Sequence, residues 1–188
     1  MITILNRKTL HTMQIRDMLE FDRLGPLRSD WVLAPDLSEV NGVSKKYWKL
    51  TGDVVSEMSQ PEKDAVDAAE FYEHKLLKYE AIDAKTSALI AQGFQFPTDG
   101  YMYSLSLESQ ANIHGVFTAR NLGVNYPIHW LNIDEQGSVD LENANDVTEF
   151  FLTALGTIRA HKDSGTVLKD LVTAATTVEQ LYAIVDDR

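Results

Sequence analysis

Apolar residues recur three and four positions apart along residues 59–93, and the rest of the chain is organised around this stretch. Two parallel lines of such residues can be followed. The first line is Ala69, Tyr72, Leu76, Tyr79, Thr86 and Ile90, and the second is Ala65, Ala68, Phe71, Ile82 and Leu89. This spacing predicts one helix over residues 59–92, with a length of about 50 Å at 1.5 Å per residue.

Both ends of this predicted helix carry suitable capping residues. Ser59 is a good N-cap, and Glu62 three residues later completes a capping box. Pro61 falls in the first turn, where its missing N–H costs nothing. Gly93 then supplies a C-cap that tolerates a left-handed backbone.

The apolar stripe is typical of a helix that packs on a partner. Further copies of the chain would fit, as in a coiled-coil homo-oligomer, and so would the helix's own domain. Asp83 falls where an apolar residue is due, so the heptad pattern is interrupted. The sequence leaves both possibilities open.

Residues 46–58 alternate like a β-hairpin. Two strand-like runs, 47–50 and 54–58, flank the turn-like Thr51-Gly52-Asp53. An isolated hairpin is marginal in water, so a further strand or a helix must cover it. Trp48 could be an exposed binding aromatic, but large aromatics in small domains mostly pack in the core, and this is what we expect.

Residues 1–45 give a weaker pattern. Gly25-Pro26 and Asn41-Gly42 punctuate the segment, and Trp31-Val32-Leu33 suggests one short strand. Before Gly25, the apolar residues Met13, Ile15, Met18, Leu19 and Phe21 hint at a short strand or helix. From Pro26 to Gly42 we expect an irregular, extended segment, ordered either as a docking arm on a partner or as an ordinary surface loop.

Residues 93–188 alternate between strand-like and helix-like patterns. Alternation predicts a hairpin at 94–107 around the turn at 97–100, and a second at 127–141. Helical spacing predicts helices at 108–120, 146–161 and 166–174, with Asp163-Ser164-Gly165 between the last two, and Thr177 with Gln180 caps a final one.

The fold class predicted from these patterns is α+β. It comprises an N-terminal β-hairpin arm (1–58), one long central helix (59–92) and a small C-terminal α+β domain (93–188).

Charge narrows the possible partners. Residues 1–58 hold eight Lys/Arg and eight Asp/Glu, whereas residues 59–188 hold nine and twenty, which accounts for the net charge of −11. Binding to a nucleic-acid backbone needs positive charge, so none is expected. No apolar run reaches the roughly 20 residues of a membrane span, and the N-terminus does not resemble a signal peptide. Cysteine is absent, which is consistent with a reducing cytoplasm.

Residues that could carry chemistry do not form a recognisable constellation. The five His, at 11, 74, 114, 129 and 161, show no metal-ligand spacing. The acidic pairs Asp134-Glu135 and Asp186-Asp187 fall in a turn and at the chain end, where solvated charge is the default. We therefore expect no catalytic, cofactor-binding or metal residues, and no enzymatic activity. Convergent groups with shifted pKa values in a pocket would reopen that question.

Several short motifs occur in an order that resembles phage proteins. In the C-terminal part they are Gly93-Phe94-Gln95-Phe96, Tyr101, Leu105-Ser106, Gln110-Ala111-Asn112-Ile113, His129-Trp130, Ala174-Ala175 and Thr177-Val178-Glu179-Gln180-Leu181. This part resembles a domain family of unknown function found at the ends of tail-fibre and related virion proteins of tailed bacteriophages. Tyr47-Trp48-Lys49, Met58-Ser59 and Glu62-Lys63 resemble the hairpin and helix that lead into such domains.

The resemblance covers residues 46–188 and transfers no catalytic residue. It implies a virion component assembled in the host cytoplasm, in contact with other virion proteins. The chain is short for a complete fibre and lacks a repetitive β-rich shaft. A tail, baseplate, collar or fibre-adaptor protein therefore fits better. The alternative is a tail-fibre assembly chaperone that is not retained in the virion.

Overall fold

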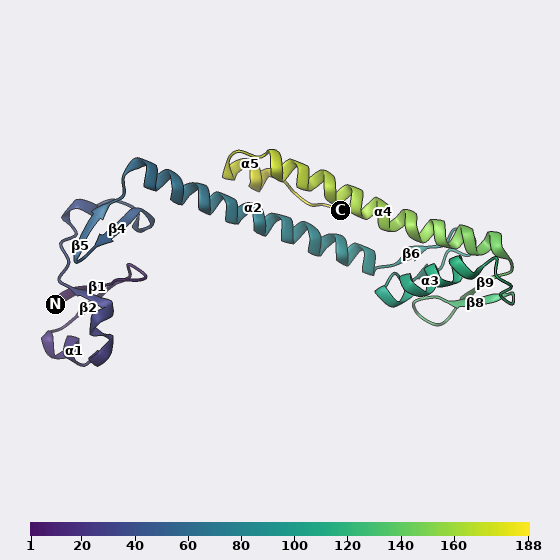
Figure 1. Cartoon of the computed structure of the whole chain (residues 1–188), viewed down its shortest axis with the longest axis horizontal. Coiled ribbons are helices and arrows are strands. Elements are labelled where there is room, and N and C mark those ends of the chain that lie inside the picture. Colours follow the sequence, from purple (N-terminus) through teal and green to yellow (C-terminus); the bar gives the residue numbers. More distant parts are fainter. The chain divides into compact units, whose positions relative to one another are not determined.

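The computed structural model describes all of residues 1–188 and has the predicted α+β class. The chain forms two compact units, residues 1–72 and 73–188. Helix α2 (Gln60–Ala91) contributes its beginning to the first unit and the rest to the second (Figure 1). The sequence placed boundaries at residues 58 and 92 instead, and each unit is described separately below.

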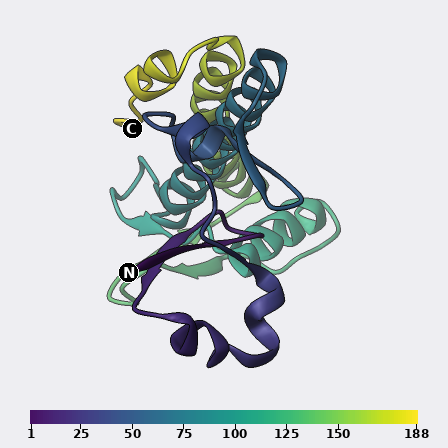
Figure 2. The ribbon, with the colours of Figure 1, turned by 90° about the vertical axis from the view of Figure 1, so that its left-hand side faces the viewer.

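The first unit contains a three-stranded antiparallel sheet of order β2-β1-β3. The strands are β1 (Ile2–Asn6), β2 (Thr12–Ile15) and β3 (Trp31–Leu33). Between β2 and β3 lie helix α1 (Met18–Asp22) and the 3₁₀ turn η1 (Gly25–Asp30), which are drawn in purple in Figure 2. The short strand predicted at 31–33 is confirmed, and the apolar residues between 13 and 21 that hint at a strand or helix fall in β2 and α1. The expectation of an irregular, extended segment is wrong for residues 26–33, which lie in η1 and β3.

Strand β1 shows no strand pattern in the sequence because both of its faces are buried. Successive side chains of a strand point to opposite faces. Ile4 and Leu5 are each 0% exposed: Ile4 packs with Ile15 and Phe21, and Leu5 packs in a second cluster. That second cluster consists of Leu5, Val32, Val40, Trp48 and Val55. A strand buried on both faces lacks the apolar–polar alternation by which single strands are recognised.

The predicted hairpin is confirmed as β4 (Trp48–Thr51) paired with β5 (Val54–Glu57). It follows the 3₁₀ turns η2 (Ser38–Val40) and η3 (Lys45–Tyr47). Trp48 is buried, and its indole N–H donates to the Val43 carbonyl at 3.0 Å. The hairpin therefore has the cover that it needs, because Trp48 and Val55 pack against Leu5 of the sheet.

The predicted long helix is confirmed in α2, and both of its ends are fixed. The Glu62 carboxylate accepts from the Ser59 backbone N–H at 2.9 Å, as in a capping box, and from the Ser59 hydroxyl at 2.8 Å. At the other end Gly93 has φ +90°, and its N–H donates to the Ile90 carbonyl. A Cβ at Gly93 would lie 2.2 Å from the Tyr103 carbonyl oxygen, so glycine is required there for space as well as conformation.

The second unit is built on the antiparallel packing of α2 and α4 (Ala144–Ala174). The Tyr79 hydroxyl lies 2.9 Å from that of Thr173, Lys169 pairs with Asp83, and Gly165 lies against Thr86. Asn143 caps α4 by accepting from the backbone N–H groups of residues 145 and 146.

The prediction of two helices, 146–161 and 166–174, is wrong, because α4 is continuous. Gly165 does not end the helix. It is buried, and a Cβ there would lie 2.7 Å from the Thr86 Oγ1 atom. The glycine therefore allows α2 to approach α4, a role that only the tertiary structure reveals.

The remaining helices and strands of this unit correspond to those predicted from the sequence. They are β6 (Phe94–Gln95), β7 (Met102–Tyr103), α3 (Leu107–Ala119), β8 (Ile128–Leu131), β9 (Ser138–Leu141) and α5 (Val178–Ala183). Strands β6 and β7 form one antiparallel hairpin, and β8 and β9 form another. Phe150 of α4 lies at the centre of their core, with the rings of Phe94, Phe96, Tyr103 and Trp130 at 5.0–5.4 Å between centroids.

Candidate functional site

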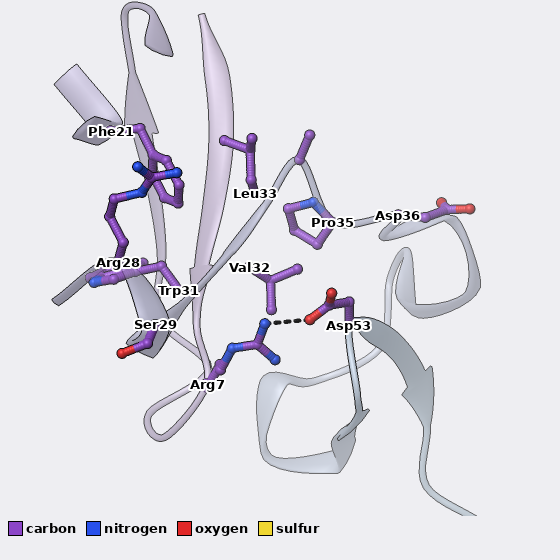
Figure 3. Close-up of a pocket in the computed structure, with 11 residues that line it drawn as sticks. Arg7, Phe21, Arg28, Ser29, Trp31, Val32, Leu33, Pro35, Asp36 and Asp53 are labelled. Carbon is purple, nitrogen blue, oxygen red and sulfur yellow. Dashed lines mark hydrogen bonds and ion pairs between the residues drawn. The ribbon is translucent and has the colours of Figure 1, made fainter. Parts of the chain in front are cut away.

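A hollow with a volume of about 580 Å³ lies in the first unit, beside β3 (Figure 3). The side chains of Phe21 and Arg28 stand at one side, and the Arg7–Asp53 pair stands at another. Since β3 pairs only with β1, it is an edge strand. A hollow beside an edge strand can accept an extended segment, which adds to the sheet through backbone hydrogen bonds.

The charges in this hollow are already balanced within the chain. Arg7 pairs with Asp53 and donates to the Gly52 carbonyl at 2.8 Å. Arg28 pairs with Asp22 at 2.8 Å and lies over the Phe21 ring. The backbone N–H of Ser38 holds the pKa of Asp36 below its ordinary value. The hollow therefore offers no uncompensated positive charge to an anion.

The other groups with shifted pKa values lie outside the hollow. The hydrogen bonds that Lys46 donates to Asp67 and then Glu70, with a further one to Tyr47, raise the pKa of Lys46, and Lys46 in turn lowers the pKa of Asp67. Lys49, with help from Ser59, lowers the pKa of Glu62 to about 2. These contacts attach the first turns of α2 to the residues around β4, which is a structural role.

The histidines do not converge. His129 is exposed on β8, where its Nδ1 lies 2.6 Å from an Asp140 carboxylate oxygen on β9. His74 meets the ring of Tyr182 and His114 that of Phe151, whereas His11 is exposed. No group of three or more His, Asp or Glu side chains is arranged to hold a metal ion.

Both acidic pairs were expected to be solvated, and one of them is not. Asp134-Glu135 lies exposed in the turn after β8. Asp186, by contrast, is largely buried in a double hydrogen bond with Arg188, at 2.8 and 2.6 Å, which lowers its pKa. The guanidinium group also donates to the Thr86 hydroxyl and the His161 carbonyl, both at 3.1 Å. Sequence reasoning missed this contact, which attaches the last residues to α2 and α4.

The predicted stripe of α2 has two different environments. From Tyr79 onward its residues lie toward α4, and Ile82 is 2% exposed. Before that point two residues of the stripe are exposed, Tyr72 at 61% and Leu76 at 42%. The stripe therefore packs on α4 from Tyr79 onward and is partly exposed before it.

Further apolar side chains are exposed near the end of the α2–α4 pair where α2 enters the second unit. There the Lys75 ammonium donates to the Thr173 carbonyl, and His74 contacts Tyr182. Three large side chains beside these contacts are between 42% and 66% exposed: Leu76, Leu171 and Tyr182. Large apolar side chains exposed at one end of a helix pair can contact other proteins.

Comparison with known proteins found no matching family model, curated protein or solved structure. None of the helices is both long and apolar enough to cross a membrane. The candidate site with the strongest physical argument is therefore the exposed apolar end of the α2–α4 pair.

Proposed function

We propose that this chain is a structural component of a bacteriophage particle, in the tail, baseplate or collar or as a fibre adaptor, and that it acts through protein–protein contacts. The observation that carries this proposal is the apolar end of the α2–α4 pair, with Leu171 and Tyr182 more than half exposed. Burying such side chains against a partner is favourable by about 25 cal/mol per Å² of apolar surface.

The virion setting rests on the order of the motifs that resemble tail-fibre and related virion proteins. Two of these motifs have clear structural roles. Gly93 makes the turn against Tyr103, and Thr177 caps α5 by accepting from the backbone N–H of Gln180. These motifs thus specify the second unit, and the exposed end of that unit supplies the contact surface.

The test is quantitative mass spectrometry of purified particles of a tailed phage that carries this gene. We expect the chain at a fixed number of copies per particle. If it is made in the infected cell but missing from finished particles, the structural role is refuted and the assembly-chaperone alternative is supported.

A double variant tests the surface itself. Leu171→Ser with Tyr182→Ser should keep its helical circular dichroism but be incorporated into particles at a much lower level. The matched control is Leu122→Ser with Leu152→Ser, two other exposed leucines of the same unit, at 81% and 56%. Equal incorporation of both variants would exclude this end of the α2–α4 pair as the contact surface.

A further inference from the structure

The side of α2 that faces away from α4 carries a second regular apolar repeat. Its members are all exposed and are spaced four, three, four and three residues apart: Leu77, Ala81, Ala84, Ala88 and Ala91. At 100° per residue these positions cluster on one face, and Tyr79, Ile82 and Thr86, which lie toward α4, fall on the opposite face. We call residues 73–91 on this side the outer face.

Charged residues flank the outer face in a consistent order. Glu73 and Glu80 lie along one side of it, and Lys78 and Lys85 lie along the other. None of the four has an oppositely charged residue three or four positions away, where helix neighbours pair. Glu73, Lys78 and Glu80 take part in no ion pair within the chain, and Lys85 acts only at a distance on Asp186.

We propose that the outer face packs against the same face of a second copy of this chain, with the two α2 helices parallel and in register. With the repeat at the a and d positions, the glutamates occupy g and the lysines occupy e. In a parallel pair each g residue meets the e residue five positions later on the other helix. Glu73 then meets the second copy's Lys78, and Glu80 meets its Lys85.

The same charges disfavour an antiparallel orientation of the two helices. In that orientation g positions face g positions and e positions face e positions. Glutamates would then lie beside glutamates, and lysines beside lysines. The charge order therefore specifies the direction of packing as well as the partner.

The alanines allow two helix backbones to approach closely, and Leu77 supplies one large apolar contact. The repeat ends at Ala91, which lines a shallow groove together with Leu107, the first residue of α3, and Leu107 is 85% exposed. Since mostly methyl groups are buried, we expect a weak, concentration-dependent association. It would be strengthened where other contacts hold copies together, as in the particle proposed above.

The first test uses the absence of cysteine from the chain. Ala91→Cys in the full-length protein should oxidise to a disulfide-linked dimer, because parallel helices in register bring this residue beside its own copy. Ala160→Cys, on an exposed alanine of α4, is the matched control and should crosslink roughly tenfold more slowly or less.

A mixture of cysteine variants tests the orientation. In an antiparallel pair a positions face d positions, so Leu77 of one helix would lie opposite Ala88 of the other. If Leu77→Cys crosslinks to Ala88→Cys, and neither crosslinks to itself, the pair is antiparallel and the proposal is wrong. It is equally wrong if Ala91→Cys reacts no faster than Ala160→Cys.

Charge reversal gives a test that misfolding cannot imitate. Glu73→Lys and Lys78→Glu should each weaken self-association, measured by analytical ultracentrifugation at low salt, and their equimolar mixture should restore it. A mixture that associates no better than its components refutes the charge pairing. These readouts are independent of particle incorporation: a monomeric chain found in virions would overturn this inference alone, whereas a self-associating chain absent from virions would overturn only the structural role.

Discussion

The two units bury their apolar residues in different ways. In the first unit a single central strand, β1, contributes adjacent residues to cores on both of its faces. In the second unit one face of α4 covers two hairpins and α3, and Phe150 is surrounded by four aromatic rings. The first arrangement depends on pairing between segments distant in sequence, and the second on the regular period of long helices.

The surfaces of the units differ as well. The residues before α2 carry balanced charge, and their lysines pair with the first turns of the helix through Asp67, Glu70 and Glu62. The second unit holds most of the excess negative charge, and the majority of its exposed large apolar residues lie on helices. We infer that the helical surface of the second unit is the more suitable one for contacts with partners.

The largest effect is expected from Phe150→Ala in the second unit. The substitution leaves a cavity among Phe94, Phe96, Tyr103 and Trp130, and should lower the free energy of unfolding by about 3–5 kcal/mol. Urea unfolding, followed by the fluorescence of Trp130 in a variant whose other tryptophans are replaced by Phe, measures it. The control is Leu152→Ala, two positions along and 56% exposed, with an expected change within about 0.5 kcal/mol.

A somewhat smaller effect is expected from Leu5→Ala in the first unit. Leu5 is fully buried against Trp48 and Val55, so its truncation should cost about 2–4 kcal/mol. Hydrogen exchange should show the loss of protection in β1, β3, β4 and β5. Leu33→Ala, in the same sheet but 37% exposed, should cost less than half as much. Equal losses would mean that the core does not lie on this face of β1.

The same contrast explains which elements the sequence could predict. Helix α2 and the hairpins after it carry local signals, such as the capping box at Ser59 and Glu62 and the turn at 97–100. For β1 no such signal exists, because Ile4 and Leu5 are buried on opposite faces and pack against residues up to fifty positions away. The predicted break in the helix at Gly165 is wrong for a related reason, because the role of this glycine depends on its contact with Thr86 in another helix.

The candidate sites were harder to predict than the elements. The period of α2 revealed an apolar stripe, but not that α4 covers the half of it from Tyr79 onward. The outer face consists mainly of alanines, which carry a weak hydrophobic signal, so it becomes visible only once the position of α4 is known. The contact between Arg188 and Asp186 could not be predicted, because α2 and α4 supply the other acceptors.

An intermediate effect is expected at the junction after α2. Gly93→Ala must place a Cβ at positive φ and 2.2 Å from the Tyr103 carbonyl oxygen, and should cost about 1–3 kcal/mol in the second unit. Gly123→Ala is the matched control, because Gly123 has a similar φ of +84° but no neighbouring atom within 4 Å. The difference between the two variants in thermal unfolding measures the close approach alone. No difference would mean that conformation is the only requirement at Gly93.

The smallest effect is expected from the pH dependence of the first unit. Lys49 and Ser59 lower the pKa of Glu62 from 4.5 to about 2, so the folded state favours the ionised carboxylate. Its stabilising contribution is therefore fully present above pH 4.5 and is lost as the pH falls toward 2. Glu62→Gln should lower the urea midpoint at pH 7, and the gap to wild type should narrow at pH 3. Glu39→Gln, an exposed carboxylate of the same unit outside any ion pair, should change neither midpoint. A gap that stays constant between pH 7 and pH 3 would show that Glu62 stabilises the start of α2 through geometry and not through its charge.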